Sequence, residues 1–456
     1  MQKHSNFGRN VEWTPGASLQ PKTIEEVLSI LNSNPEKQFR AGGSLHAWSD
    51  GVISDEIYLD LKHIDFITPG PDGKSVRVGA GCQIKQLLTA LKAFDLTLPT
   101  IGLIDEQTVA GATATGTHGS GKPCLSQFIE SIEIAHFDRN GQATLSVINS
   151  APQLQAAKCS LGLLGIVTAV TFECRPNYKI KEHLQKHATL KQVLNEEKRF
   201  PLQQFYLMPW SWDLYGHHRV ESNEPTSRFA MLYQLYWSLI VDRGLHIILF
   251  LMVKVLRSNF LTRNFYRLVL PLVFVRNWNV VDEAHTLLTM NHELFRHIEI
   301  ELFVRRQKLP AALEYVKETI CLMGGVSNRK ANTSELDHLK DAYTHHYPIC
   351  VRRVESDNTF LSMASATKAG DDEDWYAISL ISYHAIKNRN GFFEFANFLA
   401  TSMAERFDAR PHWGKYNPLT KVEVANLFPK LDEFRDIQDE FDPSRQFSNE
   451  WLKRTI

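Results

Sequence analysis

The chain has 456 residues, a formal net charge of −1 and 22% charged residues. This length is enough for two domains with separate cores, and the balanced charge argues against an overall electrostatic attraction to nucleic acid. The six cysteines are scattered, with no CxxC pair or zinc-type spacing, which is typical of reduced thiols in a cytosolic-type compartment.

The first 175 residues alternate short strands with helices. Thr23, followed three residues later by Glu26, predicts a capped helix over residues 23–31. Apolar residues at helical spacing predict a second helix within residues 84–94. Runs rich in apolar and β-branched residues predict strands at residues 37–40, 57–61, 75–79, 132–137, 143–147 and 165–172. These elements predict an α+β domain.

A second unit is expected after a candidate boundary at Arg175-Pro176. It contains predicted strands at residues 204–210, 298–304, 347–354 and 377–383, and a predicted helix near residues 313–321. The last 50 residues read as helical.

Residues 243–281 stand out because they contain no Asp or Glu. Among their apolar runs lie six cations, Arg243, Lys254, Arg257, Arg263, Arg267 and Arg276. One interpretation is a helical elaboration with solvated cations; the other is an amphipathic surface that lies on anionic lipid. No uncharged apolar run reaches transmembrane length and no signal peptide is recognisable, so we expect a cytoplasmic protein, to which the second interpretation adds membrane association.

Two glycine- and histidine-containing segments carry the strongest functional signal. They are residues 40–50 and residues 111–121. Small residues let backbone N–H groups approach an anion closely, so the pair predicts a bound diphosphate cofactor whose reactive ring lies near the histidines. Neither a Rossmann fingerprint nor a Walker A motif is present. Taken alone, Gly42-Gly43 also fits a simple tight turn.

Five segments in chain order resemble the vanillyl-alcohol-oxidase superfamily, in its branch of sugar-lactone and alditol oxidases. They are residues 43–50, 109–121, 160–167, 410–415 and 441–447. The resemblance implies a two-domain FAD-binding fold of the α+β class, with an FAD domain at residues 1–176, a cap domain at 177–405 and a C-terminal segment, 406–456, that returns to the FAD domain.

The family's chemistry implies an FAD-dependent oxidoreductase. The expected reaction removes hydride from a CH–OH group of a polyol, sugar or aldonolactone, with oxygen as the acceptor that becomes hydrogen peroxide. Two alternatives stay open: a membrane-associated dehydrogenase that acts on a lipid-linked sugar or reduces a membrane carrier, and a non-catalytic flavin-binding protein. No metal ion is expected.

The resemblance also implies which residues contact FAD. His46 matches the histidine that is often bonded covalently to the flavin, although Ala47 stands where the family usually has Ser. A histidine that only packs on the ring stays open for His46, and a backbone-bonded structural histidine for His118. A glycine at position 102 is compatible with oxygen access and with a plain turn. The expected cofactor-binding set is Ala41, Gly42, Gly43, Ser44, Leu45, His46, Ala47, Gly102, Thr108, Gly111, Thr115, Gly116, Thr117, His118, Ile166 and His412.

The expected catalytic residues are Arg352, Lys415 and Cys350. The family shows Glu-x-Arg on a strand, and here Cys350 replaces the carboxylate. A thiol acts as a base only if its pKa is depressed, which the neighbouring Arg352 and Arg353 favour; an inert packed cysteine is the alternative. Ser379 and His384 are further candidates for the pocket, the latter in an uncertain register.

Overall fold

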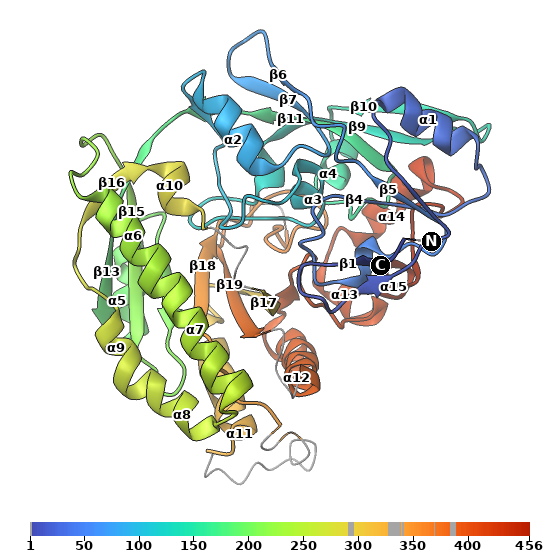
Figure 1. Cartoon of the computed structure of the whole chain (residues 1–456). Helices are drawn as coiled ribbons and strands as arrows, with labels where there is room; N and C mark the ends of the chain where they lie inside the picture. Colours follow the sequence, from blue (N-terminus) through green and yellow to red (C-terminus); the bar gives the residue numbers. More distant parts are fainter. Residues whose placement is uncertain (1, 291–295, 327–338, 340–341, 369, 384–388) are drawn as a thin grey trace.

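The computed structural model describes residues 2–290, 296–326, 339, 342–368, 370–383 and 389–456 (Figure 1). The prediction for His384 lies outside these residues.

Two sheets form the first part of the chain. A parallel sheet has the order β3-β5-β4, with β3 at Ala17–Leu19, β5 at Ile57–Asp60 and β4 at Phe39–Gly42. A five-stranded sheet has the order β10-β9-β11-β7-β6, with β6 at Ile67–Pro69, β7 at Ser75–Gly79, β9 at Ile129–Phe137, β10 at Ala143–Ile148 and β11 at Ile166–Glu173.

Helices cover these sheets where the sequence predicts them. Helix α1 (Ile24–Asn32) begins at Thr23, whose side chain accepts a hydrogen bond from the backbone N–H of Glu26. Helix α2 (Ile84–Lys92) buries its apolar stripe. Shorter elements are β1 (His4–Ser5), β2 (Glu12–Trp13), β8 (Leu96–Thr97), β12 (Arg175–Pro176), α3 (Val109–Ala114), α4 (Gln153–Ala157), α5 (Leu190–Asn195) and α10 (Ala284–Leu288).

An antiparallel sheet of eight strands follows. Its order is β16-β13-β15-β14-β18-β19-β17-β20. The strands are β13 (Lys179–His187), β14 (Gln204–Leu207), β15 (Leu214–Ser222), β16 (Val280–Glu283), β17 (His297–Arg305), β18 (Ile349–Val354), β19 (Trp375–Tyr383) and β20 (Arg410–Pro411). Helices α11 (Leu309–Met323) and α12 (Arg389–Phe407) contact β17 and each other.

Residues 229–275, here called the helical hairpin, form two helical rods. The first runs through α6 (Ala230–Tyr236), η4 (Trp237–Gly244), α7 (Leu245–Leu249) and η5 (Phe250–Val255). The second contains α8 (Asn259–Asn264), η6 (Phe265–Val269) and α9 (Leu270–Val273). Figure 1 shows the hairpin at one edge of the molecule, beside the eight-stranded sheet. Among the described residues, no helix combines the length and apolar character needed to cross a bilayer.

The C-terminal helices return to the first part of the chain. They are α13 (Lys421–Leu427), α14 (Leu431–Phe441) and α15 (Glu450–Thr455), and α14 contacts α4. The buried Arg40 guanidinium donates to the carbonyl oxygens of Phe447 and Leu161, at 2.5 and 2.7 Å. The C-terminal segment is therefore held against the first part of the chain, and both chain ends lie on the same side of the molecule in Figure 1. The domain limits at residues 176 and 405 stay a prediction; the eight-stranded sheet starts with β13, just after residue 176, and its last strand in the chain, β20, lies just beyond residue 405.

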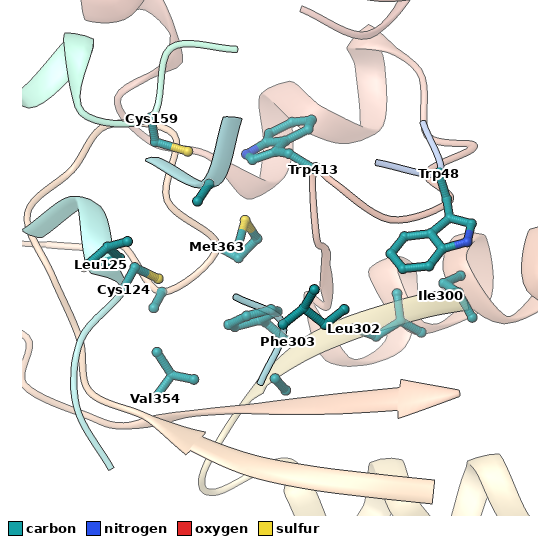
Figure 2. Close-up of a cluster of buried hydrophobic side chains, with 14 of the residues drawn as sticks. Trp48, Cys124, Leu125, Cys159, Ile300, Leu302, Phe303, Val354, Met363 and Trp413 are labelled. Carbon is teal, nitrogen blue, oxygen red and sulfur yellow. The ribbon is translucent and has the colours of Figure 1, made fainter. Parts of the chain in front are cut away.

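One buried core joins the two parts. Figure 2 shows Trp48 from the N-terminal loop and Trp413 from the C-terminal segment in the same cluster as Leu302 of β17. The Trp48 indole donates to the carbonyl of His297 at 2.7 Å. These contacts set the glycine-rich loop against the eight-stranded sheet.

Candidate active site

A cavity of about 340 Å³ lies between the loop at residues 41–49, helix α3 and one face of the eight-stranded sheet. Every site residue predicted from the sequence lines this cavity except Gly102 and Gly116. The structure thus brings together residues that lie up to 374 positions apart, from Ala41 to Lys415.

The loop at residues 43–47 has free donors. Within the described part of the chain, no acceptor bonds the backbone N–H groups of these five residues. These residues are half-buried and line the cavity, so the row of donors is available to an anionic ligand. Gly42 and Gly43 are needed for a further reason: a Cβ at Gly43 would overlap the side chain of Thr108, and one at Gly42 that of Tyr58.

His46 lines the cavity and has an unpaired ring nitrogen. Its Nδ1 is buried without a hydrogen-bond partner, and its ring stacks on Phe7 with the centroids 4.9 Å apart. Burial lowers the pKa of His46 to about 4, so the ring is neutral and its lone pair is available near pH 7. This environment fits a histidine that bonds a cofactor.

One side of the cavity combines polar side chains on a face of the eight-stranded sheet with Lys415, which follows β20. Arg352 donates from Nε to Gln204 Oε1 at 3.0 Å. Lys415 donates from Nζ to Glu299 Oε2 at 2.5 Å and lies 4.3 Å from the Trp48 ring centroid. Burial alone would raise the pKa of Glu299, but Lys415 and His297 hold it well below its usual range. Two cations and their carboxylate partners therefore face the same space.

Glu299 and Glu301 are cavity residues that the sequence analysis missed. Both lie on β17, and their period of two puts them on the same face. The alternation Ile298-Glu299-Ile300-Glu301 was a usable signal, because carboxylates at every second position of a predicted strand share one side.

Cys350 lies in the cavity wall, but its environment does not favour a thiolate. Burial raises the pKa of Cys350, although the Arg352 guanidinium acts in the opposite direction. Arg353 cannot assist, because neighbouring strand residues point to opposite faces; its guanidinium bonds Asp374 at 3.1 Å. The prediction that both arginines lower the pKa of Cys350 is therefore corrected. Arg352 lowers it, but burial has the larger effect and the thiol stays protonated.

His118 and His412 flank Glu301. Nδ1 of His118 lies 2.9 Å from the Gly119 carbonyl, to which it donates, and Nε2 lies 3.5 Å from Glu301 Oε2. Burial lowers the pKa of His412 to about 3, and its Nδ1 accepts the Gly414 N–H at 2.9 Å.

The ligand-type atoms of His118, Glu301 and His412 lie within 4.8 Å of one another. In a neutral His412 whose Nδ1 is an acceptor, the hydrogen sits on Nε2, which then has no lone pair for a metal ion. The group is better suited to handling protons than to holding a metal.

Gly102 and Gly116 have packing roles. A Cβ at Gly102 would lie 2.9 Å from Thr117 Cγ2, and one at Gly116, whose φ is +73°, 2.8 Å from Met363 Cε. Ser379 lines the cavity and donates to Glu299.

The other end of the cavity is mainly apolar, with Asp242 and His246 as polar members of its lining. It is walled by the inner side of the helical hairpin and by the ends of β18 and β19. Its side chains include Trp237, Val241, Leu245, Phe274, Tyr347 and Ile381. Polar groups for hydride chemistry and a hydrophobic compartment thus share one cavity.

Two family models match this chain. The family model described as D-arabinono-1,4-lactone oxidase matches residues 170–455, and the model described as FAD binding domain matches residues 15–138. A long-chain alcohol oxidase of an uncultured marine euryarchaeote is 43% identical, over 98% of this chain and 96% of its own. An alditol oxidase of a Streptomyces species is 24% identical, over 98% of both chains.

Among solved structures, cholesterol oxidase from B. sterolicum has a TM-score of 0.76 at 15% identity and covers 99% of this chain and 96% of its own. This likeness confirms the predicted α+β, two-domain FAD-binding fold.

Proposed function

Since the chain belongs to the D-arabinono-1,4-lactone oxidase family, we propose that it oxidises the CH–OH group of an alcohol that carries a long apolar chain. The chain is an FAD-linked oxidoreductase that acts on CH–OH donors. FAD, when bound, accepts the hydride from the carbinol carbon. The residues of this chain bind, orient and neutralise charge around that event.

The cofactor fits the residues present. The free N–H donors of residues 43–47 suit the pyrophosphate, and the orphaned Nδ1 of His46 suits a covalent bond to the flavin ring. Arg352 and Lys415 supply positive charge where negative charge develops on the substrate oxygen or the reduced ring.

The apolar end of the cavity carries the substrate proposal. A polyol there would find polar partners at Asp242 and His246, but further hydroxyl groups would face apolar side chains such as Val241 and Phe274, which is costly. A hydrocarbon chain would instead gain about 0.8 kcal/mol for each buried methylene group. The 43% identical relative is named a long-chain alcohol oxidase, which supports the same substrate class. A polyol or lactone substrate stays a prediction with less support.

Chain length should therefore control catalytic efficiency. Along a series of 1-alkanols, kcat/KM is expected to rise about fourfold per methylene group until the apolar end is filled, because each buried CH₂ contributes about 0.8 kcal/mol. Steady-state kinetics on the series measures this. Val241→Asp should flatten the slope, and a flat wild-type series would contradict the proposal.

Oxygen is the proposed electron acceptor, with hydrogen peroxide as the product. Several relatives are named oxidases, whereas one from Mycobacterium tuberculosis is named L-gulono-1,4-lactone dehydrogenase. A peroxide assay during turnover distinguishes the two: one peroxide per alcohol consumed is expected, and turnover only with an artificial acceptor would contradict it.

The helical hairpin supports a second proposal, that the enzyme lies on a membrane surface. Sixteen of the twenty exposed large apolar side chains found in the described residues lie between Phe229 and Val275, including Met231 at 80% and Leu272 at 83% exposure. The cations of this stretch are exposed, apart from the half-buried Arg263. Apolar side chains ringed by Arg and Lys are the pattern of helices that lie in the interface of anionic lipid.

Vesicle binding tests this second proposal. The protein should co-sediment with vesicles that contain anionic phosphatidylglycerol, and less with neutral phosphatidylcholine vesicles, because the cations add about 1 kcal/mol each near an anionic surface. Leu272→Asp with Met231→Asp should weaken binding. Val422→Asp is the matched control, since Val422 is 73% exposed but lies outside the hairpin. Equal binding by both variants would contradict the assignment of this surface.

A further inference from the structure

Cys350 stands where the family has a glutamate. The eight-stranded sheet brings the carboxylate of another residue, Glu301, close to this position. Cross-strand pairing sets Cys350 opposite Ser379, and Ser379 opposite Glu301, so the three side chains form one row on the cavity face. Because the thiol and the hydroxyl are small, Glu301 extends along the row towards β18. Its Oε1 lies 3.8 Å from Nη1 of Arg352.

Glu301 has an oxygen to spare for a substrate. Its side chain is 2% exposed, and its Oε1 is buried without a hydrogen-bond partner. Burial alone would raise the pKa of Glu301, but His118, and to a smaller extent His412, hold it below its usual range, so the carboxylate is ionised near pH 7. An ionised buried oxygen without a donor is costly unless a ligand hydroxyl supplies one.

Glu299 has no carboxylate oxygen left to accept a proton from the substrate. Its Oε1 accepts from Ser379 and its Oε2 accepts from Lys415. The protonated thiol of Cys350 cannot accept a proton, and burial also raises the pKa of the Tyr206 phenol. Of these four cavity residues of the sheet, Glu301 alone combines ionisation with a free acceptor atom.

His118 fixes the direction of that atom. Since the ring donates from Nδ1 to the Gly119 carbonyl, its Nε2 faces Oε2 of Glu301, and the other oxygen, Oε1, lies towards Arg352. His118 is thus a positioning residue for Glu301, which agrees with its place in the glycine-rich segment.

We propose that Glu301 is the catalytic base, with Oε1 accepting the hydroxyl proton of the alcohol. The inference rests on the proposed function. The O–H bond breaks and its proton bonds to Oε1, while the pair of electrons it leaves forms the C=O bond. The hydride leaves the same carbon with its electron pair and reduces FAD by two electrons. The carboxyl group then returns its proton to water when the carbonyl product leaves.

Glu301→Gln tests the proposal by anaerobic mixing with a 1-alkanol such as 1-decanol. Flavin reduction should slow by about 10²- to 10⁴-fold, the usual contribution of a positioned base. Glu301→Asp keeps the carboxylate and should recover part of that rate, even if the Gln variant is unstable. Glu133→Gln is the matched control, a buried carboxylate paired with Arg77 in the five-stranded sheet, and should leave the rate unchanged.

Ligand binding gives a readout independent of turnover. Decanoate, followed by its perturbation of the flavin spectrum at a pH where it is ionised, should bind Glu301→Gln at least about tenfold more tightly, because a like charge is removed beside its head group. Neutral decanamide should change little. A purely structural role for Glu301 would weaken both ligands together.

These experiments distinguish a failure of the proposed function from a failure of the assignment of Glu301 as the base. Wild-type flavin that no alkanol reduces would contradict the proposed function itself. A wild-type enzyme that is reduced, with Glu301→Gln reduced at the same rate or with unchanged decanoate affinity, would overturn the assignment of Glu301 alone.

Discussion

Arg352→Ala is expected to reduce the rate of flavin reduction by alcohol about 10²- to 10³-fold while the flavin stays bound. The guanidinium faces the cavity, is held by Gln204, and lies 3.8 Å from the Glu301 carboxylate. Removing a positioned cation from a low-dielectric site costs about 2.7–4 kcal/mol in the transition state. Flavin retention follows because the loop at residues 43–47 and His46 are untouched. Stopped-flow absorbance without oxygen measures both quantities.

Arg353→Ala is the matched control for this variant. Its side chain leaves the opposite face of β18 and bonds Asp374 and the Pro201 carbonyl. It should retain the wild-type rate, with any loss confined to thermal stability. An Arg352→Ala enzyme with near-normal rate would contradict the assignment of this strand to the active site.

His46→Ala is expected to convert a flavin that survives acid precipitation into one that acid releases. The neutral, unpaired Nδ1 of His46 is the proposed point of attachment, and no other residue of the loop at 41–47 offers a nitrogen nucleophile in its side chain. Loss of the bond should also lower the flavin potential. For a two-electron couple, a drop of about 30 mV makes the equilibrium constant for flavin reduction tenfold smaller.

Absorbance of the supernatant after acid precipitation measures the released flavin. His136→Ala is the control, a buried histidine bonded to Ser146 in the five-stranded sheet, and its flavin should stay with the pellet. Release of flavin from the wild type would contradict covalent attachment.

Local signals in the sequence predicted much of the fold. The Thr23 cap, the hairpin of β9 and β10, and the strands that become β17, β18 and β19 all appear where residue patterns place them. Strands β13, β15 and β16 were missed, because their polar and charged residues pack at sheet positions that depend on partners elsewhere in the chain.

The sequence predicted which segments form the site, but it did not predict how their side chains are arranged in space. The motifs identified His46, Arg352 and Lys415, but the meeting of Glu301 with Arg352 depends on the register of three strands and on two small side chains between them. Similarly, the acid-free stretch at residues 243–281 left two interpretations open. Only the fold shows that one rod of the hairpin has an exposed apolar face and another side that walls the cavity.

The central claim is that this FAD enzyme oxidises alcohols with long apolar chains. Its most direct test is to mix the purified protein, without oxygen, with 1-alkanols of increasing length and separately with alditols and aldonolactones, while the flavin absorbance is followed. We expect the longer alkanols to bleach the flavin, at a rate that increases with each added methylene group. Bleaching by alditols or aldonolactones alone would contradict it.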